Sequence, residues 1–481
     1  MSRKYDANLI VIGAGSGGLV TAYIAAAIKA KVILIERSDM GGDCLNTGCV
    51  PSKSLIASAK YIHAIGQSGN FGVRQASCEF DFAEIMARVH RIIDSIRPHD
   101  SVERYTALGV DVIRGQAEIT SQHTVRVNDR EYSARSIVIA AGAEPFVPAI
   151  EGIENCDYYT SDTIWNLTTL PTRLVILGGG PIGCELSQCF ARFGSQVSLV
   201  ERQDRILSRE DKEYSEQVTR RFRDEGVNVL TGHDARSIRV EGDRKYLQCD
   251  SNGTKVDIEF DVILVALGRA ARIENYGLEN LKIPISPARK IEANDYLQAG
   301  YTSIYAVGDV VGPYQFTHVA AHQAWYACVN ALFRPFKKFR VDYSVIPWCT
   351  YTDPEVARVG LNEQEANQQN IAYEVTRYEL SELDRARADG HAEGSIKVLT
   401  VPGKDKILGA TIIGKHAGDL IAEFVLAMRH GLGLNKILGT IHVYPTWMEA
   451  NKNAAGNWKK AHAPQWALVF LEKFHRWRRN R

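Results

Sequence analysis

The chain has 481 residues, of which 45% are hydrophobic and 23% are charged, and its formal net charge is +1. This length predicts two to four globular domains with ample core, and the neutral balance gives no argument for nucleic acid as a partner. No apolar run is long enough to span a bilayer, and seven of the nine cysteines lack metal or disulfide-framework spacing, so we expect a soluble cytoplasmic protein.

The N-terminal segment predicts a dinucleotide-binding βαβ unit. Residues 8–12 form a buried parallel strand, after which Gly13, Gly15 and Gly18 open a helix over residues 19–30. A second strand ends at Glu36, whose carboxylate is placed to accept hydrogen bonds from ribose hydroxyls. Glycines at this spacing let the backbone approach a pyrophosphate at the helix N-terminus, although a tight glycine turn without a ligand is the alternative.

Two cysteines follow, within the stretch Gly-Gly-Asp-Cys-Leu-Asn-Thr-Gly-Cys-Val-Pro-Ser-Lys. Five residues apart in a regular helix, Cα atoms lie roughly 8–9 Å apart, whereas a disulfide needs about 4.4–6.8 Å. Cys44 and Cys49 can therefore bond only across a turn, for which Gly48 supplies a special backbone angle. Pro51 suits the first turn of a helix that begins near Cys49, and the helix dipole with Lys53 would favour the Cys49 thiolate. The pair is either redox-active or structural.

This segment resembles the redox-active segment of the flavoprotein disulfide reductases, the family of dihydrolipoamide dehydrogenase, glutathione reductase and mercuric reductase. The resemblance extends to about residue 460. It implies that FAD occupies the first nucleotide site, where Gly42 also contributes, and that Lys53 lies against the flavin ring. It further implies a Cys44–Cys49 disulfide, with Cys49 facing the flavin as the charge-transfer thiol and Cys44 attacking the substrate.

The rest of the first FAD segment, which we expect to cover residues 1–150, is mostly helical between residues 55 and 110. A buried strand over residues 136–142 ends at Gly142 and resembles the place where the family's chain leaves the FAD domain. The family usually has Thr-Gly there, and Ala141 replaces the threonine.

A second βαβ unit repeats the pattern in a domain expected over residues 151–270. Strands over residues 173–177 and 196–200 flank a glycine loop and a helix that runs to residue 193, and a strand over residues 261–268 returns the chain to the FAD domain. The expected NAD-binding residues are Gly178, Gly180, Gly183, Glu201 and Gly268. Two dinucleotide sites imply transfer between NAD(P)H and FAD. Glu201 would repel a 2′-phosphate and favours NADH, but Arg202 and Arg205 leave NADPH open.

Glu185 has two interpretations. It either complements the dipole in the first turn of its helix, or, as the resemblance implies, contacts Lys53 beside the nicotinamide. The FAD domain then resumes over residues 271–345. There Asp309, at the end of a strand, would hold a ribityl hydroxyl, and His318 begins a helix whose N-terminus points at the flavin. His318 and His322 have a metal-ligand spacing, but no third ligand lies nearby and we expect no metal cofactor.

Residues 346–460 predict an antiparallel sheet with flanking helices, including one over residues 417–430. The expected strands are residues 348–350, 355–359, 394–400 and 407–413. The resemblance implies that this domain forms a homodimer and that the second subunit completes the substrate site.

The substrate site departs from the family pattern. Thiol-disulfide members carry His-Pro-Thr-x-x-Glu, whose histidine is the acid-base group, whereas this chain has Tyr444 at that position and Glu449 at the end. A phenol titrates near about 10 and an imidazole near about 6.5, so tyrosine is a poor proton acceptor at neutral pH. Glu449 is either catalytic or part of a capping box with Thr446. His442 could substitute, but in a strand-like run it would point elsewhere than Tyr444.

Mercuric reductases resemble this chain in having tyrosine there, but they carry a C-terminal vicinal cysteine pair and an N-terminal metal-binding domain. This chain has no cysteine after Cys349, and we expect no such N-terminal domain. Neither activity transfers cleanly, so three hypotheses stay open: a dihydrolipoyl dehydrogenase, a mercuric or other soft-metal reductase, and a membrane-docked redox module.

The tail, residues 461–481, predicts an amphipathic helix with Trp466, Phe470, Phe474 and Trp477 on one face and a basic end. It could lie on an anionic membrane at the inner face, dock a partner, or pack on its own dimer.

The sequence therefore predicts an α/β protein with two Rossmann-like dinucleotide-binding domains, for FAD and NAD, and a C-terminal α+β dimerisation domain. We expect a homodimeric FAD enzyme that passes electrons from NAD(P)H to the Cys44–Cys49 disulfide and on to a small-molecule or protein disulfide, or to a soft metal ion.

Overall fold

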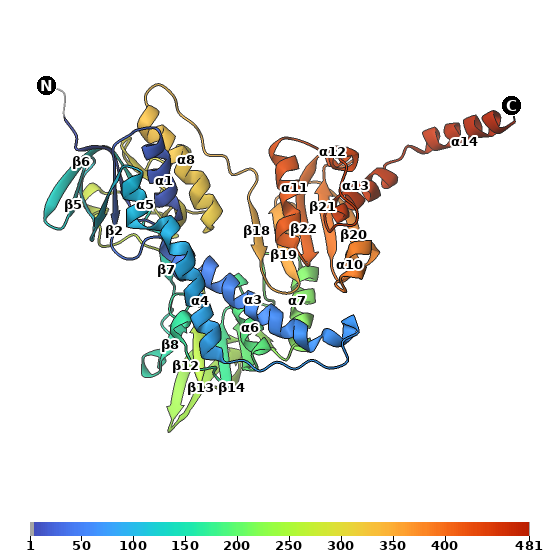
Figure 1. The fold of residues 1–481 in the computed structure, drawn as a ribbon, viewed down its shortest axis with the longest axis horizontal. Coiled ribbons are helices and arrows are strands. Elements are labelled where there is room, and N and C mark those ends of the chain that lie inside the picture. The colour runs from blue at the N-terminus through green and yellow to red at the C-terminus, as the bar shows by residue number, and fades with distance from the viewer. Residues whose placement is uncertain (1–3, 481) are drawn as a thin grey trace. The chain divides into compact units, whose positions relative to one another are not determined.

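The computed structural model describes residues 4–480, which divide into two compact units (Figure 1). The first unit contains the described residues up to Gly66 together with Ser77–Ile206 and Glu225–Asp342. The second unit contains Gln67–Ala76, Leu207–Asp224 and the chain from Tyr343 onward.

A parallel sheet in the order β3-β2-β1-β6-β17 forms the core of the first nucleotide domain. Its strands are β1 (Ala7–Ile12), β2 (Val32–Glu36), β3 (Val110–Arg114), β6 (Arg130–Ile139) and β17 (Ile304–Ala306). Alternate residues of these apolar strands face two separate cores, and helices α1 (Ser16–Ala27) and α8 (Thr317–Phe333) lie side by side over one of them (Figure 1). The predicted βαβ unit is confirmed, although its helix begins and ends three residues earlier than expected.

Strand β6 is longer than the sequence predicted and ends earlier, at Ile139. Its first half pairs antiparallel with β5 (Thr124–Val127), which pairs with β4 (Glu118–Ser121). The turn between β5 and β6 is Asn128-Asp129, both with positive φ (49° and 60°), a two-residue hairpin signal that the sequence analysis missed.

Four helices connect β2 to β3, as expected for residues 55–110. They are α2 (Gly42–Asn46), α3 (Cys49–Gly66), α4 (Phe82–Ile96) and α5 (Val102–Ala107). Helix α3 packs against both α4 and α6 (Pro181–Arg192), so the helix that starts at the second cysteine contacts the helix of the second nucleotide domain.

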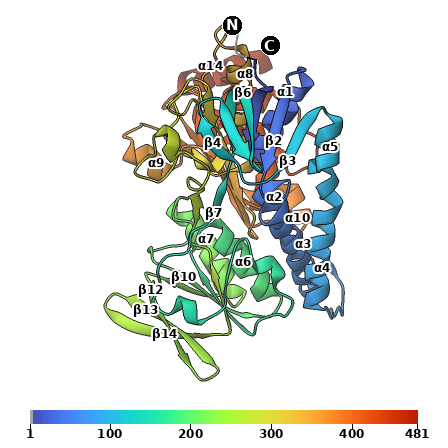
Figure 2. The same cartoon turned by 90° about the vertical axis from the view of Figure 1, so that its left-hand side faces the viewer.

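The second nucleotide domain has a parallel sheet in the order β11-β10-β9-β15-β8. Its strands are β8 (Tyr158–Thr160), β9 (Arg173–Leu177), β10 (Gln196–Glu201), β11 (Asn228–Thr231) and β15 (Val262–Val265). An antiparallel meander that the sequence analysis missed follows β11 (Figure 2): β12 (Asp234–Glu241), β13 (Arg244–Ser251) and β14 (Thr254–Phe260). Short strands β7 (Ala143–Pro145) and β16 (Arg269–Ala271) pair where the chain crosses between the two domains.

The second unit is built on the antiparallel sheet β18-β19-β22-β21-β20. Its strands are β18 (Pro347–Thr350), β19 (Glu355–Gly360), β20 (Glu374–Glu379), β21 (Ser395–Thr400) and β22 (Ile407–Gly414). Its helices are α7 (Lys212–Asp224), α9 (Glu363–Gln368), α10 (Asp384–Ala388), α11 (Ala417–Arg429), α12 (Leu434–Gly439), α13 (Glu449–Ala461) and α14 (Gln465–Arg479). The predicted sheet is confirmed, apart from β20, which was not expected.

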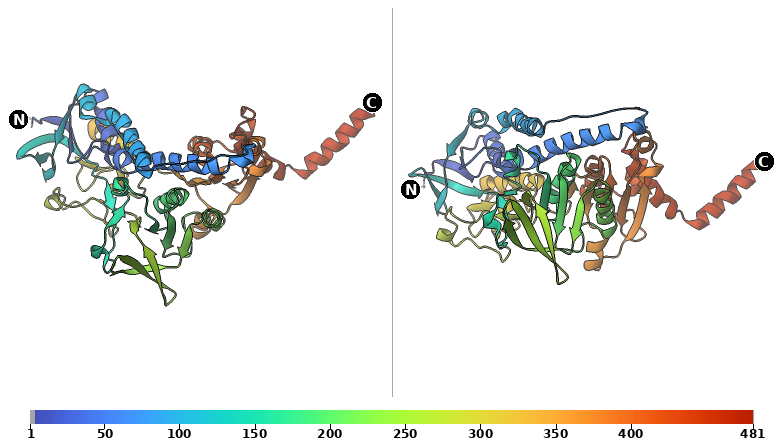
Figure 3. Two further views of the ribbon diagram at one scale, coloured as in Figure 1. Left: turned by 60° about the horizontal axis from the view of Figure 1, so that its bottom comes forward. Right: turned by 90° about the horizontal axis from the view of Figure 1, so that it is seen from below.

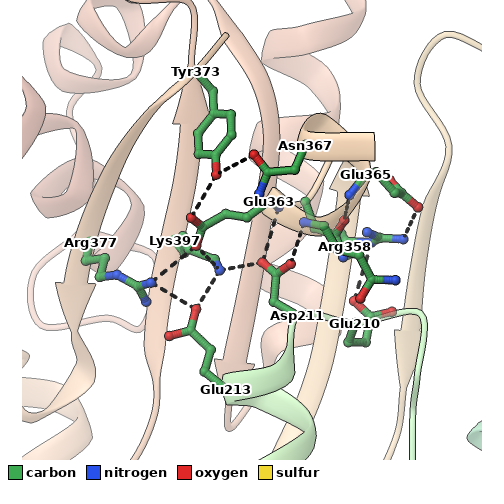
Figure 4. A network of polar contacts seen from close by, with 12 residues as sticks. Glu210, Asp211, Glu213, Arg358, Glu363, Glu365, Asn367, Tyr373, Arg377 and Lys397 are labelled. Atoms are coloured by element: carbon green, nitrogen blue, oxygen red, sulfur yellow. Dashed lines mark hydrogen bonds and ion pairs between the residues drawn. The ribbon is translucent and has the colours of Figure 1, made fainter. Parts of the chain in front are cut away.

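A buried lysine ties the Leu207–Asp224 segment to this sheet (Figure 4). The Lys397 ammonium, which is fully buried, bonds Asp211, Glu213 at 2.5 Å and Glu363 at 2.7 Å. The three carboxylates lie within 4.8 Å of one another, close enough to ligate a metal ion, but the lysine already places a positive charge among them. This cluster therefore has its own internal cation.

Helix α14 continues the chain after α13 and a short link at residues 462–464 (Figure 3). The amphipathic helix predicted for the tail is present, and none of its side chains is buried. Among the described residues, no helix combines the length and apolarity that a membrane crossing requires.

Candidate active site

The two predicted redox cysteines lie on either side of a break between two helices. Cys44 belongs to the short helix α2, which ends at Asn46, and Cys49 is the first residue of α3. Gly48 has no positive φ, which corrects the expectation of a special backbone angle there; a Cβ at this position would instead lie 2.8 Å from the Asp43 carbonyl oxygen. The positive φ angles fall on Gly41 (94°) and Gly42 (58°), where the chain turns into α2.

Both cysteines are free thiols in this structure, which corresponds to the reduced form of the pair. A hydrogen bond from the Cys44 thiol is the main reason that the pKa of Cys49 falls to about 6, and Thr317, 3.6 Å from the Cys49 sulfur, and Lys53 also lower it. The same hydrogen bond raises the pKa of Cys44. At neutral pH the reduced pair therefore holds one thiolate, on Cys49, and one thiol, on Cys44.

Lys53 and Glu185 form an ion pair between α3 and α6. The Lys53 ammonium lies 2.8 Å from the Glu185 carboxylate, whose side chain is 6% exposed. Glu185 is the fifth residue of α6 and lies beyond its first turn, so the expectation of a first-turn position was wrong and dipole complementation does not explain it. The contact with Lys53 is present, and its placement beside a nicotinamide stays a prediction.

The two glycine loops have the same geometry. Gly13 (φ 98°) and Gly178 (φ 107°) both turn the chain where a Cβ would meet a backbone carbonyl, that of Ala140 and that of Ala266 respectively. Likewise, a Cβ on Gly18 would meet the carbonyl of Gly13, and one on Gly183 that of Gly178. These four glycines are therefore required by the fold itself.

The middle glycine of each loop is different. Gly180 has an ordinary φ of −75°, and no atom lies within 4 Å of an added Cβ; Gly15 has a φ of −81°, and the nearest atom is the Gly42 Cα at 3.8 Å. Neither backbone strain nor packing requires glycine here. Open space in front of a helix N-terminus fits a pyrophosphate that approaches the backbone, so the chain fits a dinucleotide at both loops.

The acidic residues of the two βαβ units also match. The Glu36 carboxylate accepts the amide N–H of Ala14 at 2.6 Å and of Ser38 at 2.7 Å. The Glu201 carboxylate accepts those of Gly179 and Gln203, both at 2.7 Å. Each acid is thus held at the end of the second strand, beside its glycine loop, and its contact with a ribose stays a prediction.

Asp309 lies in a single 3-10 turn directly after β17. Burial raises its pKa to about 6, partly opposed by Arg269, and no residue of the described chain donates a hydrogen bond to its carboxylate. A half-buried carboxylate without a donor fits the predicted role of accepting a hydrogen bond from a ribityl hydroxyl.

Arg269 was not expected from the sequence. It lies next to Gly268 (φ 107°), and its guanidinium bonds Asp43 at 2.5 Å and Asp162 at 2.8 Å, so it links the redox segment to the second nucleotide domain. Gly142 (φ 72°) lies on the same crossing, where its carbonyl accepts the N–H of Arg272 at 3.0 Å. The sequence shows Asp43 beside Cys44 and Arg269 after a strand, but it gives no indication that the two residues form a contact.

Helix α8 begins at Thr317, as expected near His318. No side chain caps its N-terminus, and the His318 ring stacks on Phe316 at 5.3 Å. The His322 ring bonds the Asp342 carbonyl at 3.0 Å instead of sharing a ligand with His318. The direction of this N-terminus toward a flavin stays a prediction.

Tyr444 and Glu449 lie in the second unit. The Tyr444 hydroxyl donates to the Asp384 carboxylate at 3.1 Å, which raises its pKa, and its side chain is 67% exposed. The Glu449 carboxylate accepts the Thr446 N–H at 3.3 Å, but the Thr446 hydroxyl donates to the Val443 carbonyl, so only half of a capping box forms. His442 is held away in a pair with Glu423 at 2.9 Å.

These features define an FAD- and NAD(P)H-dependent oxidoreductase with a disulfide redox centre. Residues 7–324 match the model of the pyridine nucleotide-disulphide oxidoreductase family, and residues 346–455 match its dimerisation domain. The chain belongs to this family.

Relatives with two different activities match equally well. A mercuric reductase from Lysinibacillus sphaericus is 34% identical over 94% of this chain and 82% of its own. A dihydrolipoyl dehydrogenase from Chlamydia muridarum is 34% identical over 93% of this chain and 96% of its own. The Cu(II) complex of the HOCl-induced flavoprotein disulfide reductase RclA from Escherichia coli superposes with a TM-score of 0.82 at 27% identity, covering 92% of this chain and 98% of that one.

Proposed function

We propose that this enzyme reduces a soft or readily reduced metal ion, such as Hg(II) or Cu(II), at the Cys44–Cys49 dithiol. The observation that carries the proposal is that Tyr444 occupies the position where thiol-disulfide members have an acid-base histidine. Its hydroxyl donates a hydrogen bond to the Asp384 carboxylate. The mercuric reductase relatives and the Cu(II) complex of RclA support the same substrate class.

A disulfide substrate needs a group that accepts and returns the proton of the attacking thiol. Asp384 raises the pKa of Tyr444, so even less of the phenolate that could accept a proton is present at neutral pH, and His442 is engaged with Glu423. A metal ion needs ligands and an electron source but no acid-base group, so the loss of the histidine does not impair its reduction. The two cysteine thiolates and the Tyr444 hydroxyl would hold the ion.

In this proposal, different residues of the chain have different roles. When bound, NADH would supply a hydride, and FAD would relay the two electrons to the Cys44–Cys49 disulfide, which is thereby reduced to the dithiol. Glu36 and Asp309 would hold FAD, the Lys53–Glu185 pair would orient the two rings, and Cys49 would carry the thiolate. Cys44 would offer its sulfur to the metal. The reaction balances as NADH + Hg(II) → NAD⁺ + H⁺ + Hg(0), or with two Cu(II) reduced to two Cu(I).

NADH is the preferred donor in this proposal. Glu201 keeps its carboxylate at the strand end beside the glycine loop, where it would hydrogen-bond a free ribose hydroxyl and repel a 2′-phosphate. Steady-state kinetics with both nucleotides test this preference.

The working form in this proposal is a cytoplasmic homodimer. The loop that carries Tyr444 also exposes Ile441 by 96% and Val443 by 74%, side chains that a second copy would cover. The match to the family's dimerisation domain supports the same assembly.

The deciding experiment is anaerobic reduction with NADH followed by mixing with Hg(II), Cu(II), lipoamide and glutathione disulfide. We expect metal-stimulated NADH oxidation that is lost in Cys44→Ser and kept in Cys78→Ser, which removes an exposed cysteine outside the site. Lipoamide turnover that exceeds metal turnover would instead support a dihydrolipoyl dehydrogenase, the activity of the Chlamydia relative.

A further inference from the structure

Helix α14 lies outside the part of the chain that the family accounts for. The match to the dimerisation domain ends at residue 455, and α14 covers Gln465–Arg479. The preceding helix, α13, contributes Ala454 and Trp458 to the core of the second unit, whereas α14 contributes no buried residue. The redox chemistry of the family gives no reason for a helix of this kind.

One face of α14 is aromatic and exposed to water. At 100° per residue, Trp466, Phe470, Phe474 and Trp477 fall within about 80° of one another. Their exposed fractions are 75%, 62%, 38% and 51%. The rings of Phe470 and Phe474 are parallel with centroids 6.5 Å apart, so the face is continuous. An exposed apolar stripe of this size indicates a surface that becomes covered.

The charges on α14 are basic and lie beside this face. The cations of the segment are Lys473, Arg476, Arg478 and Arg479, with Arg481 following in the sequence outside the described residues. Its only acid is Glu472, which pairs with Arg476 at 2.8 Å, so the segment has a net charge of +4, from five cations and one anion. Lys473 and Arg478 border the aromatic face on its two sides.

We propose that α14 binds the surface of an anionic lipid bilayer, lying in the plane of the interface with its aromatic face inserted among the headgroups. Aromatic rings favour this depth, and Lys473 and Arg478 have stems long enough to bring their charges to lipid phosphates. Cations on both borders of the face fit a planar anionic surface better than an apolar protein groove. In the homodimer proposed above, two copies of α14 would bind the same surface and strengthen its attachment.

Co-sedimentation of the purified full-length holoenzyme with vesicles tests this inference. The vesicles contain phosphatidylglycerol mixed with phosphatidylcholine, or phosphatidylcholine alone. Phe470→Asp is compared with Leu468→Asp, because both lose an exposed apolar side chain and gain one negative charge, but Leu468 lies about 160° away around the helix. NADH oxidation with the preferred acceptor shows that each variant remains an intact enzyme.

We expect the wild type to sediment with the anionic vesicles at low salt, and this binding to weaken with added salt and on neutral vesicles. Phe470→Asp should lower the partition coefficient by roughly tenfold or more, and Leu468→Asp by much less. Absence of wild-type binding to anionic vesicles would overturn the inference and leave a protein partner or a second copy of this chain as the occupant. Equal losses of vesicle binding in the two variants would show that the aromatic face is not the one inserted into the bilayer. A wild-type enzyme that binds anionic vesicles but shows no metal-stimulated NADH oxidation would contradict the proposed function alone.

Discussion

At the scale of single residues, the reduced dithiol is asymmetric because its two sulfurs share one hydrogen bond. Cys49 starts α3 and is stabilised as a thiolate by Cys44, Thr317 and Lys53, whereas Cys44 keeps its proton. The Lys53 ammonium and its Glu185 partner act on this thiolate with opposite signs. The ion pair is therefore a means of adjusting the pKa of Cys49.

Charge-removing variants of this pair should shift the Cys49 pKa in opposite directions. Lys53→Met removes an attraction and should raise it from about 6 by roughly one unit, so the thiolate signal of the reduced enzyme would appear only at higher pH. Glu185→Gln removes a repulsion and should lower it. The measurement is a pH titration of thiolate absorbance in the reduced enzyme.

Lys60→Met, which removes the same charge further along α3, is the matched control and should leave the titration close to that of the wild type. A shift of equal sign in Lys53→Met and Glu185→Gln would contradict the assignment of the thiolate to Cys49.

The sequence predicted part of this site and missed the rest for a physical reason. Motif spacing located Cys44, Cys49 and the glycine loops because these features are local, and the family resemblance supplied the Lys53–Glu185 contact. The Arg269–Asp43 and Tyr444–Asp384 contacts join residues 226 and 60 positions apart, and only the folded chain brings them together. Gly48 shows a second limit, since a glycine required for close packing and one required for a positive φ look the same in a sequence.

At the scale of elements, prediction worked best where a strand is buried on both faces. Strands β1 and β9 are nearly continuous apolar runs, and their bounds were predicted within one residue. Strands β12 and β20 mix charged residues with few apolar ones because one face is exposed, and both were missed. The buried strands are therefore enough to predict the fold class, whereas strands with one exposed face, such as β12 and β20, are not recognised from the sequence.

The two kinds of glycine in the second fingerprint should respond differently to alanine. Gly180→Ala adds a methyl group to open space at an ordinary φ, so we expect normal stability and a KM for NADH raised by roughly tenfold. Gly178→Ala places a methyl group 2.5 Å from the Ala266 carbonyl oxygen, at a φ of 107°. This change should cost about 1–3 kcal/mol of stability.

Thermal unfolding and NADH kinetics on both variants distinguish these effects. A Gly180→Ala enzyme with unchanged stability and unchanged KM would show that no nucleotide phosphate approaches this loop.

The lysine cluster of the second unit should be the main polar contribution to attaching the Leu207–Asp224 segment to the sheet. Lys397→Met leaves Asp211, Glu213 and Glu363 facing one another without a cation and should cost about 3–5 kcal/mol. Lys212→Met, which breaks a surface pair with Glu216 at 3.7 Å, should cost about 1 kcal/mol or less.

Urea denaturation followed by fluorescence measures both changes. Similar midpoints for the two variants would show that the buried ion pairs are no stronger than exposed ones. If an added divalent cation raises the stability of Lys397→Met but not that of the wild type, the lysine occupies the place of a metal ion.

At the scale of the whole molecule, the candidate site residues are divided between the two compact units. The dithiol and both nucleotide loops lie in the first unit, and Tyr444 lies in the second, on a loop with exposed apolar side chains. In the proposed homodimer, we expect Tyr444 of one subunit to complete the site at Cys44 of the other. Each active site then needs one intact residue from each copy.

Mixed dimers of two defective variants test this arrangement. Cys44→Ser and Tyr444→Ala should each lose most metal-stimulated NADH oxidation as pure dimers. After the subunits are mixed and exchanged, half of the dimers are mixed, and each mixed dimer holds one site with both native residues and one with neither. Activity should therefore rise to roughly a quarter of the wild-type value. If Tyr444 acted on Cys44 of its own subunit, every site would keep one defect, and mixing would give only the average of the two variants.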